Sequence, residues 1–399
     1  MDNQSMSAHL NISDYDLQYL YDNFGTILEH DEKQDAFIRA KFYILAFIIV
    51  MGVIFNFLAC AVFLQKGIKK TVTVIYFFAL ACADNVVLIG EILHWLKTQT
   101  TSGQYMIGHP VIDTNTHACR LNYFLRYFGR LLSSWLVVSI CVERFITVAY
   151  PLGLARSSTP RKAKVVILGL VVASFLATSP VFVVFDVRPD EIGQLTCHYF
   201  ENYQKFYYAW ILCVIFIGEL LVPSVIVLVF TILIIKKLRK AQLQRMYSKE
   251  GQKDVKKDDR KNTQTTIALL AVSIAFVTLR TPYAIMYPIH LYDHNIFPDL
   301  FQLSTFRIVY NQVMYILVVI NYTINFPLYI ITGKKFRKEF VNFVLCRGVS
   351  MQRRTSRSGS YSFQTKSSTI RRGSNGTILV RQNDSANDKS SSAFQESHL

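Results

Sequence analysis

The sequence predicts an all-α membrane protein: a bundle of seven transmembrane helices followed by a short eighth helix in the membrane interface. Three observations support this fold class. Hydrophobic residues make up 51% of the 399 residues and aromatic residues 14%, which is typical of a chain that lies in lipid rather than of an ordinary soluble protein. Seven apolar segments are each about 20 residues or longer, the length that crosses a bilayer as a helix. Lys and Arg also gather in alternate connections between these segments.

The apolar segments justify the seven helices, and their flanks predict the topology. In chain order the segments lie near 39–65, 73–98, 117–149, 163–186, 206–236, 264–291 and 305–332. Basic clusters, such as the one that begins at Lys236, follow the first, third, fifth and seventh segments. Because Lys and Arg keep short loops in the cytoplasm, we expect a multi-pass plasma-membrane protein with its amino terminus outside and its carboxyl terminus inside. This topology accounts for the net charge of +16, so we expect no nucleic-acid partner.

The seven-helix domain is expected to span 38–346, between two polar tails. Residues 1–37 form an acidic extracellular tail without the apolar run of a cleavable signal peptide, so the first helix is expected to direct membrane insertion. Asn3 and Asn11 each begin an Asn-X-Ser glycosylation motif, although such motifs also occur by chance. Residues 347–399 are rich in Ser, Thr, Arg, Gln and Asn and are expected to form a disordered cytoplasmic tail.

The third segment carries the most informative motif. Cys119 begins it and Glu143-Arg144-Phe145 closes it, with a Tyr-Pro-Leu tripeptide just beyond. About 37 Å of helix separates Cys119 from Arg144 at 1.5 Å per residue, which places them at opposite membrane faces. This arrangement resembles the third helix of rhodopsin-like (class A) G-protein-coupled receptors, whose triplet is usually Asp-Arg-Tyr. The resemblance extends over roughly residues 40–345.

Motifs in the sixth and seventh segments carry the same resemblance. Phe276 and Pro282 match the family's Phe-x-x-Cys-Trp-x-Pro motif, but Arg280 replaces the tryptophan. Asn325 and Tyr329 keep the spacing of the family's Asn-Pro-x-x-Tyr motif, with the proline one place later. The resemblance implies an agonist-driven two-state equilibrium, a heterotrimeric G protein as partner and no enzymatic activity. It assigns coupling and activation to Glu143, Arg144, Phe145, Phe276, Pro282 and Tyr329.

The resemblance also implies a disulfide and an ion site. The disulfide joins Cys119 to Cys197, which follows the fourth segment in an oxidising exterior. Asp84 is an ionisable residue inside the second segment, where such residues are costly and usually functional, although polar residues there also serve helix packing. The family cradles a sodium ion at this position. We expect Asp84, Ser133, Asn321 and Asn325 to hold this ion. We expect no other cofactor.

Further charged residues lie within the apolar segments. Arg126 and Arg130 are four residues apart and share one face of the third helix. Because unpaired charges in hydrocarbon are costly, we expect Glu219 to pair with Arg130 or Arg280. Glu91 and Arg126 are then freer to bind a ligand. A wholly internal ion-pair network is an equal alternative for Arg130 and Arg280.

The same residues indicate the class of ligand. Arg126 occupies the position of the amine-binding aspartate of aminergic receptors, which argues against a monoamine, and the seventh segment has no lysine for retinal, which excludes an opsin. Mixed charges and aromatic side chains favour a short peptide, and the acidic tail favours a basic or amidated one. The aromatic residues could equally belong to the core. The expected ligand-binding residues are Glu91, Tyr123, Arg126, Arg130, Glu219, Arg280, Tyr283, Tyr287 and Tyr315.

Within this family the chain most resembles invertebrate neuropeptide receptors. Two alternatives remain open: a chemosensory receptor of the same fold that binds an environmental ligand, and a membrane transporter. A transporter would be expected to show interrupted helices in two related halves, and the sequence has no such repeat.

The eighth helix follows the seventh segment directly. Phe336, Phe340, Phe343 and Val344 fall on one face of it, which predicts an amphipathic helix in contact with membrane lipid. Cys346 at its end is a candidate palmitoylation site or a plain free thiol. Serines and threonines beside basic residues in the following tail suit kinases and arrestin as partners, although any serine-rich tail would look similar.

Overall fold

A computed structural model describes two compact units of the chain, Met1–Phe343 and Val344–Leu399. The residues that it describes are 40–65, 68, 71–101, 111–150, 159–189, 193, 195–247, 255–292, 304–345, 371–372 and 378–379. In the second unit, β3 (Arg371–Arg372) pairs with β4 (Ile378–Leu379) in antiparallel orientation. The remainder of the predicted tail, together with Asn3, Asn11 and Cys346, lies outside the described residues.

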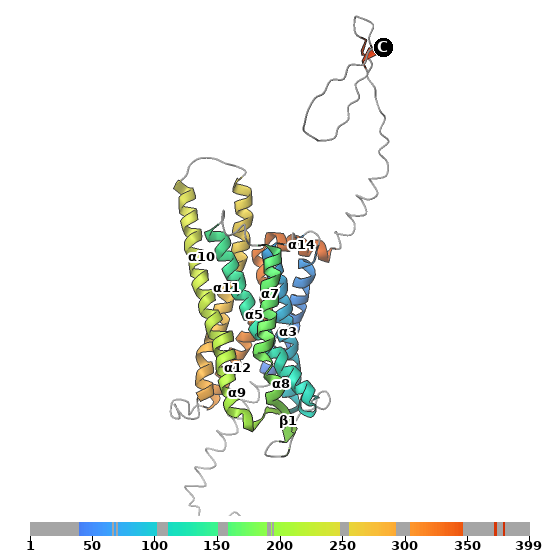
Figure 1. Ribbon diagram of the computed structural model, residues 1–399, viewed down its shortest axis with the longest axis vertical. Coiled ribbons are helices and arrows are strands. Elements are labelled where there is room, and N and C mark those ends of the chain that lie inside the picture. The colour runs from blue at the N-terminus through green and yellow to red at the C-terminus, as the bar shows by residue number, and fades with distance from the viewer. Residues whose placement is uncertain are drawn as a thin grey trace, which may run out of the picture. The chain divides into compact units, whose positions relative to one another are not determined.

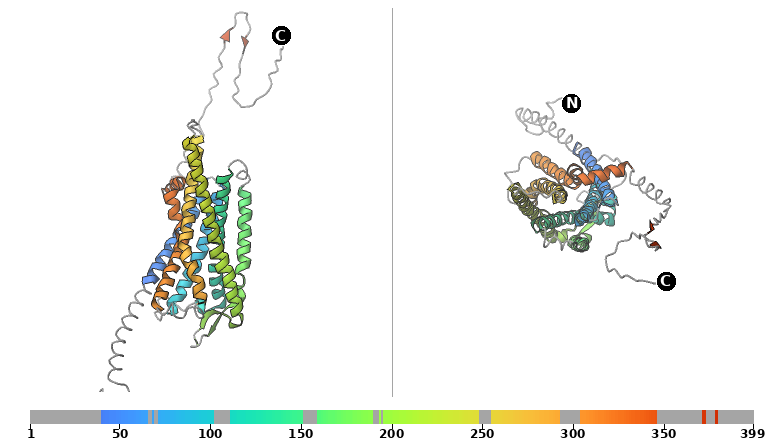
Figure 2. Two further views of the ribbon diagram at one scale, coloured as in Figure 1. Left: turned by 90° about the vertical axis from the view of Figure 1, so that its left-hand side faces the viewer. Right: turned by 90° about the horizontal axis from the view of Figure 1, so that it is seen from above.

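The first unit is a bundle of long helices (Figures 1 and 2). Figure 1 shows α14 running across one end of this bundle and strand β1 at the opposite end. The helices are Ala40–Phe63, α3 (Val72–Thr101), α4 (Val111–Thr114), α5 (Thr116–Ala149), α7 (Pro160–Thr178), α8 (Val181–Val184), α9 (Gln204–Trp210), the π-helix η2 (Ile211–Leu221), α10 (Val222–Tyr247), α11 (Val255–Tyr292), α12 (Ser304–Thr323), α13 (Asn325–Thr332) and α14 (Lys334–Val344).

The lengths and apolarity of these helices confirm the predicted fold class. Five spans are long and apolar enough to cross a bilayer: Ala40–Phe63, Val72–Leu96, Thr116–Ala149, Pro160–Val184 and Gln204–Ala241. Helices α12 and α13 form a further span that is bent by 52°. The bend lies next to Pro327, which removes a backbone donor and clashes with the preceding turn. With the shorter apolar stretch Leu269–Ile285 of α11, helices account for all seven predicted segments.

Helix α7 shows the burial pattern of a helix that faces lipid. Its buried residues are Ala163, Ser174 and Thr178, two of which are polar, whereas Leu168 and Leu176 are exposed. The Thr178 hydroxyl is satisfied within the helix because it donates to the Ser174 carbonyl oxygen at 2.7 Å. Small polar residues therefore pack inward and large apolar residues point outward, as expected where the surrounding solvent is hydrocarbon.

Two glycines allow α3 and α5 to approach each other closely. A Cβ atom at Gly129 would lie 2.9 Å from the Val87 backbone nitrogen, and one at Gly90 would lie 2.7 Å from Cγ of Arg126. The contact is closed by Asn122, whose amide nitrogen donates to the Gly90 carbonyl oxygen at 2.9 Å. This close packing brings the charged side chains of the two helices together.

Gly129→Ala is expected to destabilise the bundle by about 1–3 kcal/mol, because the added methyl group meets backbone and must separate α3 from α5. The measurement is the thermal unfolding midpoint of the detergent-purified protein. Gly169→Ala on α7 is the matched control, because a Cβ there meets nothing within 4 Å. That control should be neutral or slightly stabilising, since Ala favours helix over Gly. Equal midpoints for the two variants would contradict the close contact at Gly129.

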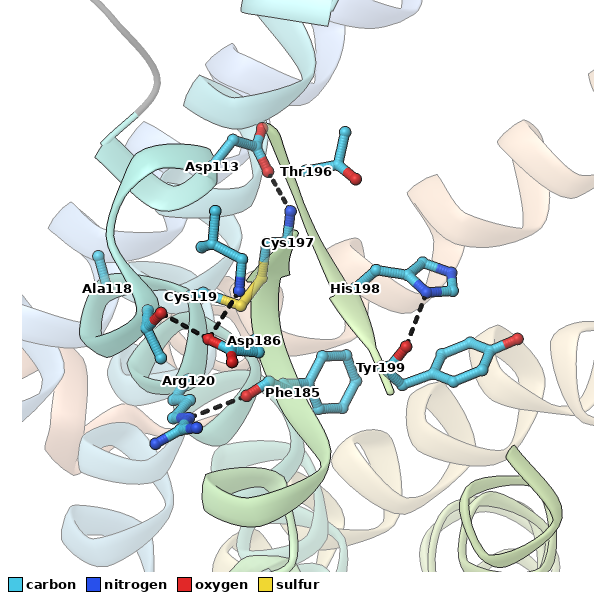
Figure 3. Close-up of a disulfide and its surroundings, with 12 residues drawn as sticks. Asp113, Ala118, Cys119, Arg120, Phe185, Asp186, Thr196, Cys197, His198 and Tyr199 are labelled. Atoms are coloured by element: carbon cyan, nitrogen blue, oxygen red, sulfur yellow. Dashed lines mark hydrogen bonds between the residues drawn. A yellow bond between two sulfur atoms is a disulfide. The ribbon is translucent and has the colours of Figure 1, made fainter. Parts of the chain in front are cut away.

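The connection after α8 forms a β-hairpin, which was not predicted from the sequence. Strand β1 (Phe185–Pro189) pairs with β2 (Leu195–Tyr199) in antiparallel register. The predicted disulfide joins Cys119 at the start of α5 to Cys197 in β2, with 5.7 Å between their Cα atoms (Figure 3). Asp113 of α4 accepts a hydrogen bond from the Cys197 backbone nitrogen at 2.8 Å. Cys197 therefore attaches the hairpin to the bundle in two ways, through its disulfide and through its backbone hydrogen bond.

The first strand of the hairpin has its own contacts with α5. Arg120 donates from Nε to the Phe185 carbonyl oxygen at 2.8 Å (Figure 3). Thr116 donates from Oγ1 to Asp186 at 2.5 Å. The Thr116 hydrogen bond, together with the backbone N–H of Val187, lowers the pKa of Asp186 below its ordinary value. The Asp186 carboxylate is thus stabilised in its charged form at the end of the bundle.

Helix α14 packs through its aromatic face onto the end of the bundle. Phe336 is buried, and its ring contacts Phe63, Phe326 and Tyr329. Phe340 packs against Phe326 with 5.4 Å between ring centroids. Of the four residues predicted to share one face, these two join the core, whereas Phe343 and Val344 are exposed.

Candidate functional site

Charged side chains of α3 and α5 and a tyrosine of α12 meet inside the bundle, further along α5 than the disulfide. Glu91 of α3 is 1% exposed, and its Oε1 atom accepts a hydrogen bond from Arg130 of α5. The same oxygen lies 3.3 Å from Nε of Arg126, and Oε2 accepts a hydrogen bond from the Tyr315 hydroxyl of α12. We call Glu91, Arg126, Arg130 and Tyr315 the arginine cluster. Arg130 thus belongs to an internal ion pair, the alternative left open for it, but its partner is Glu91, and the expectation that Glu91 is freer to bind a ligand was wrong.

A second ion pair connects η2 to α11. Arg280 is wholly buried and donates from Nη2 to Oε1 of Glu219, which is one of the two pairings expected for this glutamate. Its Nη1 donates to the Ser134 hydroxyl at 2.6 Å, and that hydroxyl donates to the Arg130 carbonyl oxygen at 2.8 Å. Ser134 therefore links the two ion pairs. Ser134 was not predicted, although its spacing of four residues from Arg130 places both on one helix face.

Aromatic rings complete the surroundings of Arg280. Its guanidinium lies 5.0 Å from the centre of the Phe276 ring and 5.7 Å from that of Tyr322. Both distances are within the range at which a cation is attracted to an aromatic face. The position where the related family has tryptophan is thus occupied by a cation that contacts a carboxylate, a hydroxyl and two rings.

Several polar atoms in these pairs lack a hydrogen-bond partner within the described part of the chain. They are Nε of Arg130, Nε of Arg280 and Oε2 of Glu219, all of them buried. An unsatisfied buried donor or acceptor costs roughly 1–3 kcal/mol, and more when it is charged. The two ion pairs therefore hold unused hydrogen-bonding capacity.

The predicted ion site is assembled around Asp84. Its Oδ1 accepts from the Ser133 hydroxyl at 2.6 Å, and its Oδ2 accepts from the Asn325 amide nitrogen at 2.7 Å. Asn321 is also buried, one turn before Asn325 in the chain. The bonded serine and asparagine keep lone pairs on their oxygens, so the residues present offer the hard oxygen donors that suit a small cation. Their chemistry fits sodium.

The other end of α5 holds the Glu143-Arg144-Phe145 triplet. Arg144 is buried, and its Nε lies 3.3 Å from Oε2 of Glu143. Phe145 packs against Phe230 of α10 with 5.3 Å between ring centroids. Tyr329 of α13 is buried at the same end, where it contacts Phe77 at 4.6 Å between ring centroids.

The predicted aromatic residues lie in different settings. Tyr123 stacks on Phe185 of the hairpin at 4.1 Å between ring centroids, and Tyr127 meets Trp210 of α9 edge to face at 5.2 Å. Tyr283 packs with the cluster formed by the first helix, α3 and α12. The side chain of Tyr287 lies outside the described residues. Phe185 and Trp210, which pack in the cluster around the disulfide, were not predicted from the sequence.

Comparison with known proteins gives a match along most of the chain. Residues 55–329 match the family model described as 7 transmembrane receptor (rhodopsin family). The chain is 26% identical over 264 residues to somatostatin receptor type 1 of Rattus norvegicus, covering 66% of this chain and 63% of that receptor. It is 25% identical over 304 residues to somatostatin receptor type 4 of Rattus norvegicus, covering 76% and 72%. A somatostatin-like receptor of Takifugu rubripes is 31% identical over 163 residues, covering 40% and 53%.

Proposed function

Because the chain belongs to the rhodopsin family of seven-transmembrane receptors, we propose that it binds an extracellular peptide and signals to a cytoplasmic heterotrimeric G protein. Its relatives include receptors for somatostatin, which is a peptide. The observation that carries the proposal is the polar series along α5, in which the half-buried Arg126 and the buried Arg130, Ser133 and Arg144 each contact a polar or charged side chain. Buried charges are costly in a membrane and are usually retained for function.

The proposed topology has the amino terminus outside and the carboxyl terminus inside the plasma membrane. Cys119 and Arg144 lie at opposite ends of α5, and a disulfide persists in an oxidising exterior. The hairpin end of the bundle then faces outward and the α14 end faces the cytoplasm. Asn3 and Asn11 would lie on the glycosylated side, and α14 would lie against lipid, with Cys346 available for acylation.

In the proposed mechanism, the peptide binds at the hairpin end and shifts a two-state equilibrium. Glu91, Tyr123, Arg126, Arg130, Glu219, Arg280, Tyr283, Tyr287 and Tyr315 are the proposed binding residues. Arg280 ties α11 to η2 and α5 in the observed state. Movement of α11 about Pro282 requires those bonds to be exchanged, and it opens the space beside Arg144 for the G protein.

We propose that a sodium ion would be held by Asp84, Ser133, Asn321 and Asn325. Bound there, the ion supplies positive charge beside a buried carboxylate. The chain itself joins α3, α5 and α13 at this point through the two hydrogen bonds to Asp84. Kinases and arrestin are the proposed partners of the serine-rich tail.

The function is tested by screening short peptides on cells that express the chain together with promiscuous G proteins. A peptide agonist is expected to raise the second messenger in a dose-dependent way. Arg144→Ala should abolish this response while surface expression and peptide binding remain, because Arg144 lies at the far end of α5 from the binding residues.

Gln204→Ala, at the start of α9, is the matched control and should signal like the wild type. Substrate uptake without G-protein dependence, or unchanged signalling by Arg144→Ala, would contradict the proposal.

A further inference from the structure

The arginine cluster has more positive than negative charge. Arg126 and Arg130 share one carboxylate, that of Glu91. Glu219 is committed to Arg280, and Asp84 is bonded to Ser133 and Asn325. In the described parts of the chain, no ion pair joins Asp84 to these arginines. The cluster therefore holds one formal positive charge without a carboxylate of its own.

Of the two arginines in the cluster, Arg126 is the more accessible to a ligand. Its side chain is 12% exposed, whereas that of Arg130 is 7% exposed and that of Glu91 is fully buried. Glu91 and Tyr315 are the described groups within hydrogen-bonding distance of its guanidinium, and both contacts are long, at 3.3 Å and 3.5 Å. A guanidinium has five donors in a planar fork, so most of the hydrogen-bonding capacity of Arg126 is uncommitted.

The surroundings of Arg126 favour an anion. Lys41 of the first helix places its Nζ atom 5.8 Å from the centre of the Tyr315 ring, which adds a cation beside the cluster. The buried Nε of Arg130 has no hydrogen-bond partner among the described residues, so a second donor is also unused. Tyr123 lies three residues before Arg126, on its hairpin side, and stacks with Tyr127, the residue after Arg126, at 6.1 Å between ring centroids. A positive site flanked by aromatic rings fits a carboxylate attached to an apolar or aromatic group.

We propose that Arg126 binds a carboxylate of the ligand, with Arg130 as a positioning residue behind it. The inference rests on the proposed peptide-receptor function and specifies the ligand class: a peptide that presents a free carboxyl terminus or an acidic side chain. It replaces the expectation of a basic or amidated peptide, which rested on the acidic tail alone. Arginine and carboxylate match in geometry and form two parallel hydrogen bonds.

The test measures how simple carboxylates shift the thermal unfolding midpoint of the purified full chain in detergent. The probes are N-acetyl-phenylalanine, which has a terminal carboxylate, and N-acetyl-aspartyl-phenylalanine amide, which has a side-chain carboxylate. N-acetyl-phenylalanine amide is the neutral control. A ligand that binds the folded state raises the midpoint by mass action. At least one carboxylate probe should raise it and the amide should not, and the two probes distinguish a terminal from a side-chain source.

Arg126→Met should weaken binding of the active probe by about tenfold or more, because a charge-assisted hydrogen-bonded pair is lost. Without any probe this variant should unfold at or above the wild-type midpoint, because Glu91 keeps Arg130 and the surplus charge is gone. Arg161→Met is the matched control, since Arg161 is exposed at the start of α7, away from the cluster and from the hairpin.

Three results would overturn the inference: equal shifts from acid and amide, no shift from either acid, or an unchanged probe affinity in Arg126→Met. Each outcome is independent of signalling. A chain that responds to an amidated, non-acidic peptide through a G protein would retain the proposed function and lose this inference. A chain that binds the carboxylates but never couples to a G protein would retain this inference and lose the proposed function.

Discussion

Replacing Arg280 with Met should reduce the free energy of unfolding by about 3–5 kcal/mol, because it leaves the Glu219 carboxylate buried without its cation. Both partners are almost fully buried, and Oε2 of Glu219 already lacks a hydrogen-bond partner among the described residues. The Ser134 hydroxyl loses its donor as well. The measurements are the thermal unfolding midpoint in detergent and the fraction of protein that reaches the cell surface.

The double variant Glu219→Leu with Arg280→Met is the decisive comparison. Replacing both members of a buried ion pair with apolar residues is often neutral or stabilising, so the double variant should regain most of the stability that Arg280→Met loses. Arg188→Met removes an exposed arginine by the same substitution and should change little. If the double variant is as unstable as the sum of the two single variants, the pair does not exist as described.

Glu91→Gln is expected to reduce the free energy of unfolding by a comparable amount. Here it is a pair of cations, and not an anion, that loses its counter-charge. This carboxylate accepts hydrogen bonds from Arg126, Arg130 and Tyr315. Neutralising it leaves two adjacent guanidiniums without a counter-charge in a low-dielectric interior, so a loss of about 3–5 kcal/mol is expected. The midpoint of thermal unfolding reports this loss directly.

Adding Arg130→Gln to Glu91→Gln should restore part of the lost stability, because only one cation then remains unpaired. The contrast with Arg126→Met is the critical test. Removing the acid should be severe and removing the surplus cation should be harmless, although the two residues contact each other. Similar losses from both substitutions would show that the charges are balanced and not in excess.

The helices could be predicted from sequence because a membrane imposes strong constraints. Every backbone donor within a hydrocarbon layer has to be satisfied inside its own segment, so long apolar runs become helices. The disulfide could be placed by resemblance, since Cys119 and Cys197 stand at the expected positions. The hairpin was not predicted: both strands alternate apolar and polar residues, but each is only five residues long, and they depend on tertiary contacts with Asp113, Thr116 and Arg120.

Glu91 was not predicted as the partner of Arg130, for a physical reason that can be identified. Spacing along α5 shows that Arg126 and Arg130 share a face, but not which neighbouring helix approaches that face. Gly90 and Gly129 decide this, because the absence of side chains lets α3 come within backbone contact of α5. Glu91 is thereby brought to Arg130. The glycines themselves were visible in the sequence and are the signal that could have identified this partner.

The π-helix η2 sets the rotation of one half of its helix relative to the other. Within it, backbone hydrogen bonds reach five residues back, as from the Val222 nitrogen to the Ile217 carbonyl oxygen. A π-helical turn holds more residues than the 3.6 of an ordinary α-helical turn. In an α-helix, each of these extra residues would rotate the following part of the helix by about 100°. A one-residue deletion there would swing Trp210 away from Tyr127 while leaving α10 in place. A change of length within η2 is therefore expected to rotate the part of the helix that precedes it, around Trp210, while α10 keeps its orientation.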